Sequence, residues 1–190
     1  ISNCVAGIVV GGGHNFVKYN LQGHGIIGGG SYNVLDAGYS GIFSGRRNTI
    51  TGPNSNYSVI SGGDDNNIIG DWSAIGGGLS NTVNGDYSFV VGKGNSAATR
   101  SNLFGNNINA SSYDGVTVFT DSVNSTLTAT VVDQFIARFA NGYLFRGGDM
   151  SLETGVSLGI GTASPAELLD VVSASGDARI RLDAPTGSDA

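Results

Sequence analysis

The chain of 190 residues has 32 glycines, only 13% charged residues and a net charge of −6. The negative charge argues against a protein that binds nucleic acid or an anionic membrane, and no apolar run is long enough for a transmembrane helix. One cysteine and two histidines, His14 and His24, exclude an internal disulfide and argue against a His-based zinc site. We therefore expect no cofactor.

The first half of the chain is an internal repeat. Each unit has a branched apolar residue six positions before an asparagine and a second branched apolar residue two positions after it. The units are Val9-Asn15-Val17, Ile27-Asn33-Leu35, Ile42-Asn48-Ile50, Ile60-Asn66-Ile68 and Ile75-Asn81-Val83. The basic unit spans 15 residues, and three further residues are inserted at one fixed corner of some units.

A unit of this length predicts one rung of a parallel β-roll or β-solenoid. At about 3.3 Å per residue it holds two strands of roughly five residues and two tight turns, which is too short for a pair of helices. Asparagine tolerates the left-handed backbone region, so we expect a structural ladder of stacked asparagines at one turn. Its members are Asn15, Asn33, Asn48, Asn66 and Asn81. The predicted class is all-β, with the repeat over residues 1–105.

Four units carry an aromatic residue three positions before the first apolar position, at Tyr39, Tyr57, Trp72 and Tyr87. Strand alternation puts these rings on the face opposite Ile42, where they form either an interface between subunits or a stacking platform for sugars. The inserted connections, 18–25 and 51–56, project at the same corner, and exposed loops on a rigid scaffold often carry recognition. The candidate ligand-binding residues are therefore Tyr19, His24, Asn54, Asn56, Tyr57 and Trp72.

Two glycine-rich segments share only composition with known ligand loops. GGGHN at 11–15 lacks the Lys and Ser/Thr of a phosphate-binding loop. GGDDN at 62–66 contains Asp64 and Asp65, but Arg46 and Arg47 occupy these positions one unit earlier, so the aspartates do not recur as they do in calcium-binding β-helices. One calcium near Asp64 and Asp65 stays open as an alternative.

Beyond Asn95 the period changes. We predict a degraded last rung at 102–109 and a small β domain at 106–148, with a hairpin at 134–146 whose Asn141-Gly142 pair suits a type I′ turn. Residues 149–190 are predicted to hold short β segments, including a strand at 156–160 and a helical turn or strand at 166–171, followed by a linker. The start at Ile1 leads us to expect a longer parent chain.

Three segments carry a resemblance to known fibrous proteins. FVVGKGNSA at 89–97 and the repeats resemble the β-roll heads of trimeric adhesins of the YadA type. VFTDSVNSTLTATVVDQFIARFANGYLF at 118–145, followed by GVSLGIGTASPAELLDV at 155–171, resembles phage tail fibres that end in an intramolecular chaperone of the endosialidase type. The resemblance implies a virion tail fibre or another extracellular surface appendage, whose partners are fibre or baseplate proteins and a cell-surface glycan or protein receptor.

The small core also favours an oligomer. Two or three buried apolar side chains per rung, at about 1.5–3 kcal/mol each, do not offset about 1–2 kcal/mol of backbone entropy for each ordered residue. Packing around a common axis would bury a second face, and a homotrimer, either intertwined or side by side, is the simplest closure. We expect a non-enzymatic receptor-binding fibre. A bacterial surface adhesin and a polysaccharide-degrading tailspike are the alternatives, although the only glutamates, Glu153 and Glu167, lie outside the repeat.

Overall fold

The computed structural model describes residues 6–18, 23–52, 55–121, 126–139, 158–160 and 169–171. The chain divides into two compact units, residues 1–143 and 144–190. Every element in the described residues is a β-strand, which confirms the predicted all-β class. A helix capable of crossing a membrane does not occur in this described part of the chain.

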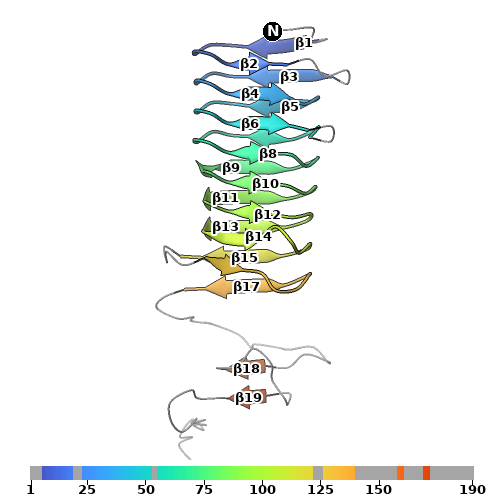
Figure 1. Cartoon of the computed structure of the whole chain (residues 1–190), viewed down its shortest axis with the longest axis vertical. Helices are drawn as coiled ribbons and strands as arrows, with labels where there is room; N and C mark the ends of the chain where they lie inside the picture. Colours follow the sequence, from blue (N-terminus) through green and yellow to red (C-terminus); the bar gives the residue numbers. More distant parts are fainter. Residues whose placement is uncertain are drawn as a thin grey trace, which may run out of the picture. The chain divides into compact units, whose positions relative to one another are not determined.

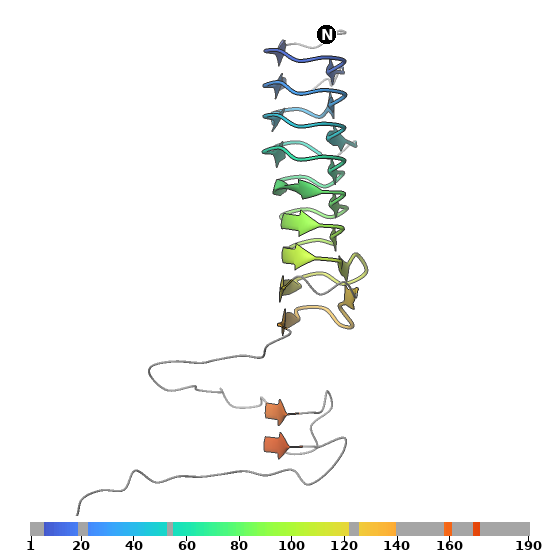
Figure 2. The same cartoon turned by 90° about the vertical axis from the view of Figure 1, so that its left-hand side faces the viewer.

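The first unit is a parallel β-solenoid of about eight turns, as the repeat predicts, and each rung adds one strand to each of two sheets (Figure 1). Sheet A consists of β1 (Ala6–Val9), β3 (His24–Ile27), β5 (Ser40–Ile42), β7 (Val59–Ile60), β9 (Ala74–Leu79), β11 (Phe89–Lys93), β13 (Asn102–Asn106), β15 (Thr117–Thr120) and β17 (Phe135–Arg138). Sheet B consists of β2 (Phe16–Val17), β4 (Val34–Asp36), β6 (Thr49–Thr51), β8 (Asn67–Ile68), β10 (Thr82–Val83), β12 (Ser96–Ala97), β14 (Ile108–Ala110) and β16 (Leu127–Thr128). Figure 2 shows the two stacks of strands on opposite sides of the rungs.

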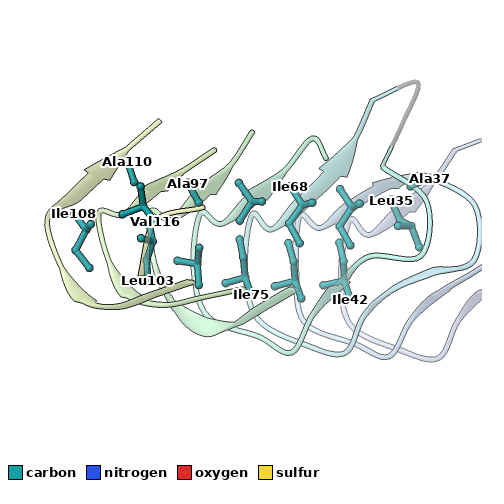
Figure 3. Close-up of a cluster of buried hydrophobic side chains, with 14 of the residues drawn as sticks. Leu35, Ala37, Ile42, Ile68, Ile75, Ala97, Leu103, Ile108, Ala110 and Val116 are labelled. Carbon is teal, nitrogen blue, oxygen red and sulfur yellow. The ribbon is translucent and has the colours of Figure 1, made fainter. Parts of the chain in front are cut away.

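The core is a double row of side chains between the two sheets (Figure 3). Sheet A contributes the first apolar residue of each unit, such as Ile42 and Ile75, and sheet B contributes the second, such as Ile50 and Ile68. These four are fully buried, whereas Val9 in the first rung is only partly buried. Because side chains alternate between the two faces of a strand, the residues directly next to these buried positions within each strand point outward. Each rung therefore depends on its neighbours to cover its few apolar side chains.

Each rung turns at two corners with different chemistry. The first corner connects a sheet A strand to the next sheet B strand, and in the third rung it contains Gly45 at φ 97° and Arg47 at φ 54°. The asparagine follows directly, at Asn48, and does not itself have positive φ. The left-handed residue is thus the one before the asparagine, and the asparagine is required for its side-chain hydrogen bonds.

The second corner connects a sheet B strand to the following sheet A strand, and it is the corner that receives the insertions. Its left-handed residues are the aromatics, among them Tyr39 at φ 52°, Tyr57 at φ 58° and Trp72 at φ 54°. A serine follows each aromatic and points inward, as at Ser58 and Ser73. At this left-handed corner the aromatic side chain points away from the solenoid and the serine that follows it points into the solenoid.

The two sheets continue past residue 105, where we predicted the repeat to end. β17 pairs in parallel with β15 (Thr117↔Phe135), so the described part of the predicted 106–148 domain extends the solenoid. The rungs are shortest just before this point: ladder contacts that span 15 or 18 residues earlier span 14 between Asn81 and Asn95 and 13 between Asn95 and Ile108. Beyond it the strand register returns to 15 residues between Asn102 and Thr117 and 18 between Thr117 and Phe135. The expected hairpin at 134–146 begins with β17, but its second strand lies outside the described residues.

The second unit contains a parallel pair of strands, β18 (Leu158–Ile160) and β19 (Leu169–Val171). They fall within the strand expected at 156–160 and the segment expected as a helical turn or strand at 166–171, of which residues 169–171 form a strand.

Candidate functional site

The outer faces of the two sheets differ in chemistry. The outward positions of sheet A are mostly apolar, and several large side chains there are exposed: Ile8, Val10, Ile26, Phe43, Phe119 and Phe135. The matching column of sheet B, defined by the strand register, consists of Phe16, Val34, Thr49, Asn67, Thr82, Ser96, Asn109 and Thr128. An exposed apolar surface of this extent marks an interaction site, so the candidate site lies on sheet A.

A hollow of about 500 Å³ opens on this face at Gly41. In the strand register Gly41 lies between Ile26 and Val59, so the column of outward side chains is interrupted by one residue without a side chain. Ile8 and Phe43 complete the apolar lining. The volume lies in the range of small-ligand pockets and also suffices for a large side chain of another molecule.

The wall of the hollow on the second-corner side is aromatic and comprises His24, Tyr39 and Tyr57. Tyr39 and Tyr57 are stacked with ring centroids 5.0 Å apart, Tyr57 and Trp72 are stacked at 4.0 Å, and His24 meets Tyr39 edge-on at 6.1 Å. Both faces of Tyr57 are therefore covered by other rings. A sugar cannot stack on Tyr57, and this side chain offers only its edge and hydroxyl group to a ligand.

A polar ladder runs behind these rings at the second corner. The Asn56 Oδ1 accepts a hydrogen bond from the Gly38 N–H at 2.9 Å, and the Asn56 N–H donates to Asp71 Oδ1 at 2.6 Å. The Asp71 N–H donates in the same way to Asp86 Oδ1 at 2.8 Å. Each side chain thus satisfies a backbone N–H of the preceding rung, which gives Asn56 a structural role whether or not it also meets a ligand.

The predicted ligand-binding residues separate into three groups. His24 and Tyr57 both line the hollow. Trp72 continues the ring stack next to it, and Asn56 holds the corner. Tyr19 and Asn54 lie outside the described residues.

Most residues that line the hollow, including Gly41 and Phe43, were not among the predicted ligand-binding residues. Gly41 occupies a variable position of the repeat, because the strand register places Ile26 and Val59 beside it and Phe89 at the same position of a later rung. The repeat pattern therefore gives no signal for this hollow.

The five asparagines stack one above another inside the first corners. Each Oδ1 accepts hydrogen bonds from the next asparagine, as from the N–H and Nδ2 of Asn48 to Asn33 Oδ1 at 2.9 and 3.1 Å. Each Nδ2 also reaches glycine-corner carbonyl oxygens, such as that of Gly63 at 3.0 Å from Asn48. All polar groups of the buried amides find partners, which is the condition for burying them without loss of stability.

Buried serines form a second internal ladder that the sequence analysis did not predict. The Oγ of Ser58 accepts from the Ser73 N–H at 3.1 Å, and the Oγ of Ser73 accepts from the Ser88 N–H at 3.1 Å. The serine after each aromatic residue was the available signal. These hydroxyl groups are occupied inside the solenoid, so they are not positioned as nucleophiles.

The two carboxylates of the acidic pair have different partners: Asp64 is engaged by arginine, and Asp65 Oδ2 accepts a hydrogen bond from Ser80 Oγ at 3.4 Å. Asp64 contacts Arg46 at 2.6 Å and Arg47 at 3.1 Å. The hydrogen bond from Arg46 lowers the pKa of Asp64. A carboxylate held by two guanidinium groups is a poor calcium ligand, and the described residues contain no group of three or more His, Cys, Asp or Glu side chains that could hold a metal ion.

Comparison with known proteins yielded no matching family model, no matching curated protein and no matching solved structure.

Proposed function

We propose that the chain is a non-enzymatic structural and receptor-binding fibre, in which three copies pack side by side and attach a particle or appendage to a cell surface. The observation that carries this proposal is the apolar outer face of sheet A. The exposed side chains on it extend from Ile8 in β1 to Phe135 in β17, the first and last strands of the sheet. An isolated soluble rod would present this whole strip to water.

Side-by-side packing of identical rods accounts for the shape of the strip. Parallel strands repeat at about 4.8 Å in every rung, so a partner that follows the face over nine strands must have the same repeat. A second and a third copy of the chain meet this requirement. Closure around an axis along the rod buries the sheet A face of each copy and leaves the polar outer face of sheet B in solvent.

Receptor attachment is supported by the second corners and by the resemblance to fibre proteins. The insertions at this corner add residues outside the regular rung, and the rigid ladders behind them fix their bases. Three weak sites on one stiff rod bind a surface with avidity, since the second and third contacts become intramolecular. Cell-surface glycans suit the hydroxyl and amide side chains in the sequence of these connections.

The first experiment measures the native molar mass by light scattering, with a denatured sample as control. A mass three times that of the 19.3 kDa chain is expected. A stable monomer at all concentrations would contradict the proposal, because the apolar strip would then be exposed.

Attachment is tested with fluorescently labelled protein on an array of bacterial surface polysaccharides. A variant in which connections 18–25 and 51–56 are replaced by the short corner of the fourth rung should keep its mass and lose binding. Undiminished binding by that variant would remove these connections from the receptor site.

A further inference from the structure

We propose that Phe43 of each copy inserts into the hollow at Gly41 of the neighbouring copy and thereby fixes the copies parallel and in register. This inference rests on the proposed function, since it names the contact through which the rods of the fibre align. Three properties of strand β5 and its flanks support it.

Phe43 projects from the outer face without large neighbours in its own column. It directly follows β5 on the first-corner side, and its side chain is 56% exposed. The residues at the same position one rung before and one rung after are Gly28 and Ser61, as the backbone bonds from Gly28 N–H to the Ile42 carbonyl oxygen and from Phe43 N–H to the Ile60 carbonyl oxygen indicate. The ring therefore stands above its surroundings and loses apolar exposure only if another molecule covers it.

Gly41 provides the complementary hollow two residues earlier on the same face. A Cβ atom at this position would lie 3.1 Å from Ile26 Cγ2, so the Ile26 side chain forms a close side of the hollow. The sides are apolar and aromatic, from Val59, Tyr39 and Tyr57. A buried phenylalanine covers about 150–250 Å² and packs well edge-to-face on tyrosine rings, which makes it a suitable occupant.

The positions of the two features favour a second copy over an unrelated partner. Phe43 borders the hollow on the first-corner side, and the aromatic wall of His24, Tyr39 and Tyr57 borders it on the second-corner side. Around an axis along the rod, the first-corner side of one copy faces the second-corner side of the next. Because one rung supplies both parts, they meet at equal height only if the copies are parallel and unshifted.

A specific contact is needed to fix the register between two copies, because the rungs of each copy are alike. Displacing one rod by a whole rung would leave most of the apolar strip in contact, and repetitive surfaces of this kind slip easily. Glycine followed two residues later by phenylalanine occurs at these outward positions only in β5 among the described strands of sheet A. In a copy displaced by one rung, Phe43 would meet the side chain of Ile26 or Val59 in place of the hollow at Gly41, which disfavours the shifted arrangement.

The distribution of charged residues is compatible with the contact between Phe43 and the hollow of a second copy. No Asp, Glu, Lys or Arg is among the residues that line the hollow in the described part of the chain. Copies that each have a net charge of −6 repel one another least where the facing surfaces are uncharged. The hollow is therefore a place where identical rods can approach without bringing like charges together.

The test compares the dissociation of the assembly on dilution, followed by light scattering, for the wild type and three variants. Phe43→Ser removes the inserted ring, and Gly41→Leu fills the hollow. Phe16→Ser is the matched control, because Phe16 is 42% exposed on the outer face of sheet B. Far-UV circular dichroism checks that each variant keeps its strands.

We expect Phe43→Ser and Gly41→Leu each to raise the dissociation concentration at least tenfold, and Phe16→Ser to leave it unchanged. A wild-type trimer whose dissociation neither variant alters would overturn the inserted phenylalanine and leave the fibre proposal standing; the hollow would then be free for a small ligand. A wild-type monomer would overturn both. Since Phe43 is exposed in the single chain, its variant remains informative even if Gly41→Leu does not fold.

Discussion

The side chain of Asn48 accepts two hydrogen bonds from Asn66, from the backbone N–H at 3.2 Å and from Nδ2 at 3.0 Å. These residues are 18 positions apart, whereas Asn66 and Asn81 make the same contacts at 3.1 and 2.9 Å with a separation of 15. The three additional residues between Asn48 and Asn66 are thus absorbed at the second corner without disturbing the first. The asparagine ladder keeps the rungs aligned while the opposite corner varies.

Replacing Asn66 with leucine should strongly destabilise the solenoid. The change leaves the buried N–H of Asn81 without the Oδ1 that it donates to, and it removes the Nδ2 bonds to Asn48 and Gly62. Unpaired buried polar groups cost about 1–3 kcal/mol each, so we expect a loss of about 2–4 kcal/mol in the free energy of unfolding in urea. Asn84→Leu is the control, because Asn84 is exposed, and should change stability by no more than about 0.5 kcal/mol. Equal effects of both variants would contradict a structural ladder.

The repeat predicted the solenoid because the spacings of its apolar residues and of its asparagine all indicate the same two-stranded rung. The six-residue spacing from Ile42 to Asn48 and the two-residue spacing to Ile50 reflect one inward side chain from each sheet with an internal amide between them. The two sheets continue beyond residue 105 although Ile108 replaces asparagine in the ladder. Its N–H still donates to Asn95 Oδ1 at 3.0 Å, so the backbone continues the pattern that the side chain abandons.

The candidate site could be predicted only in part. The common corner of His24 and Tyr57 followed from the repeat, but the hollow results from the missing side chain of Gly41, at a position where the repeat has no preference. The left-handed conformation of Tyr57 was also unpredictable from residue preferences, since bulky residues rarely adopt it. Stacking on Tyr39 and Trp72 is a compensation that only the assembled rungs can provide.

Asn67→Thr should stabilise the chain. The Asn67 Oδ1 is buried without a hydrogen-bond partner, and the residue lies between Thr49 and Thr82 on the outer face of sheet B. Threonine is the better strand former, and the change removes the unsatisfied carbonyl oxygen, so a gain of about 0.5–1 kcal/mol is expected. The reverse exchange, Thr82→Asn, should lower the urea midpoint. A lower midpoint for Asn67→Thr would show that the amide makes a useful contact in solution.

Gly45 and Gly29 should respond oppositely to alanine. Gly45 has φ 97°, and a Cβ atom there would collide with the carbonyl oxygen of Gly63 in the next rung. We expect Gly45→Ala to cost at least about 2 kcal/mol, from strain and from separation of the rungs. A Cβ at Gly29 meets no atom within 4 Å, so Gly29→Ala should be neutral or stabilise by about 0.4–1 kcal/mol. Thermal unfolding distinguishes the pair, and comparable melting temperatures would contradict the corner geometry.

The ion pairs of Asp64 should make stability depend on pH in acid. The hydrogen bond from Arg46 lowers the pKa of Asp64 in the folded chain, so the folded state binds this proton less readily than the unfolded state. The stabilisation is therefore present at neutral pH and is lost as the pH falls below about 4, through the pKa of the folded state. This stabilisation should be small and sensitive to salt, because Arg46 is exposed.

We expect the urea midpoint of Asp64→Asn to fall below that of the wild type at pH 7 in low salt, and the two midpoints to converge near pH 2 and in 1 M NaCl. Arg46→Gln should behave in the same way. A difference between Asp64→Asn and the wild type that stays constant from pH 7 to pH 2 would mean that the ion pair contributes nothing and that the variant acts through packing.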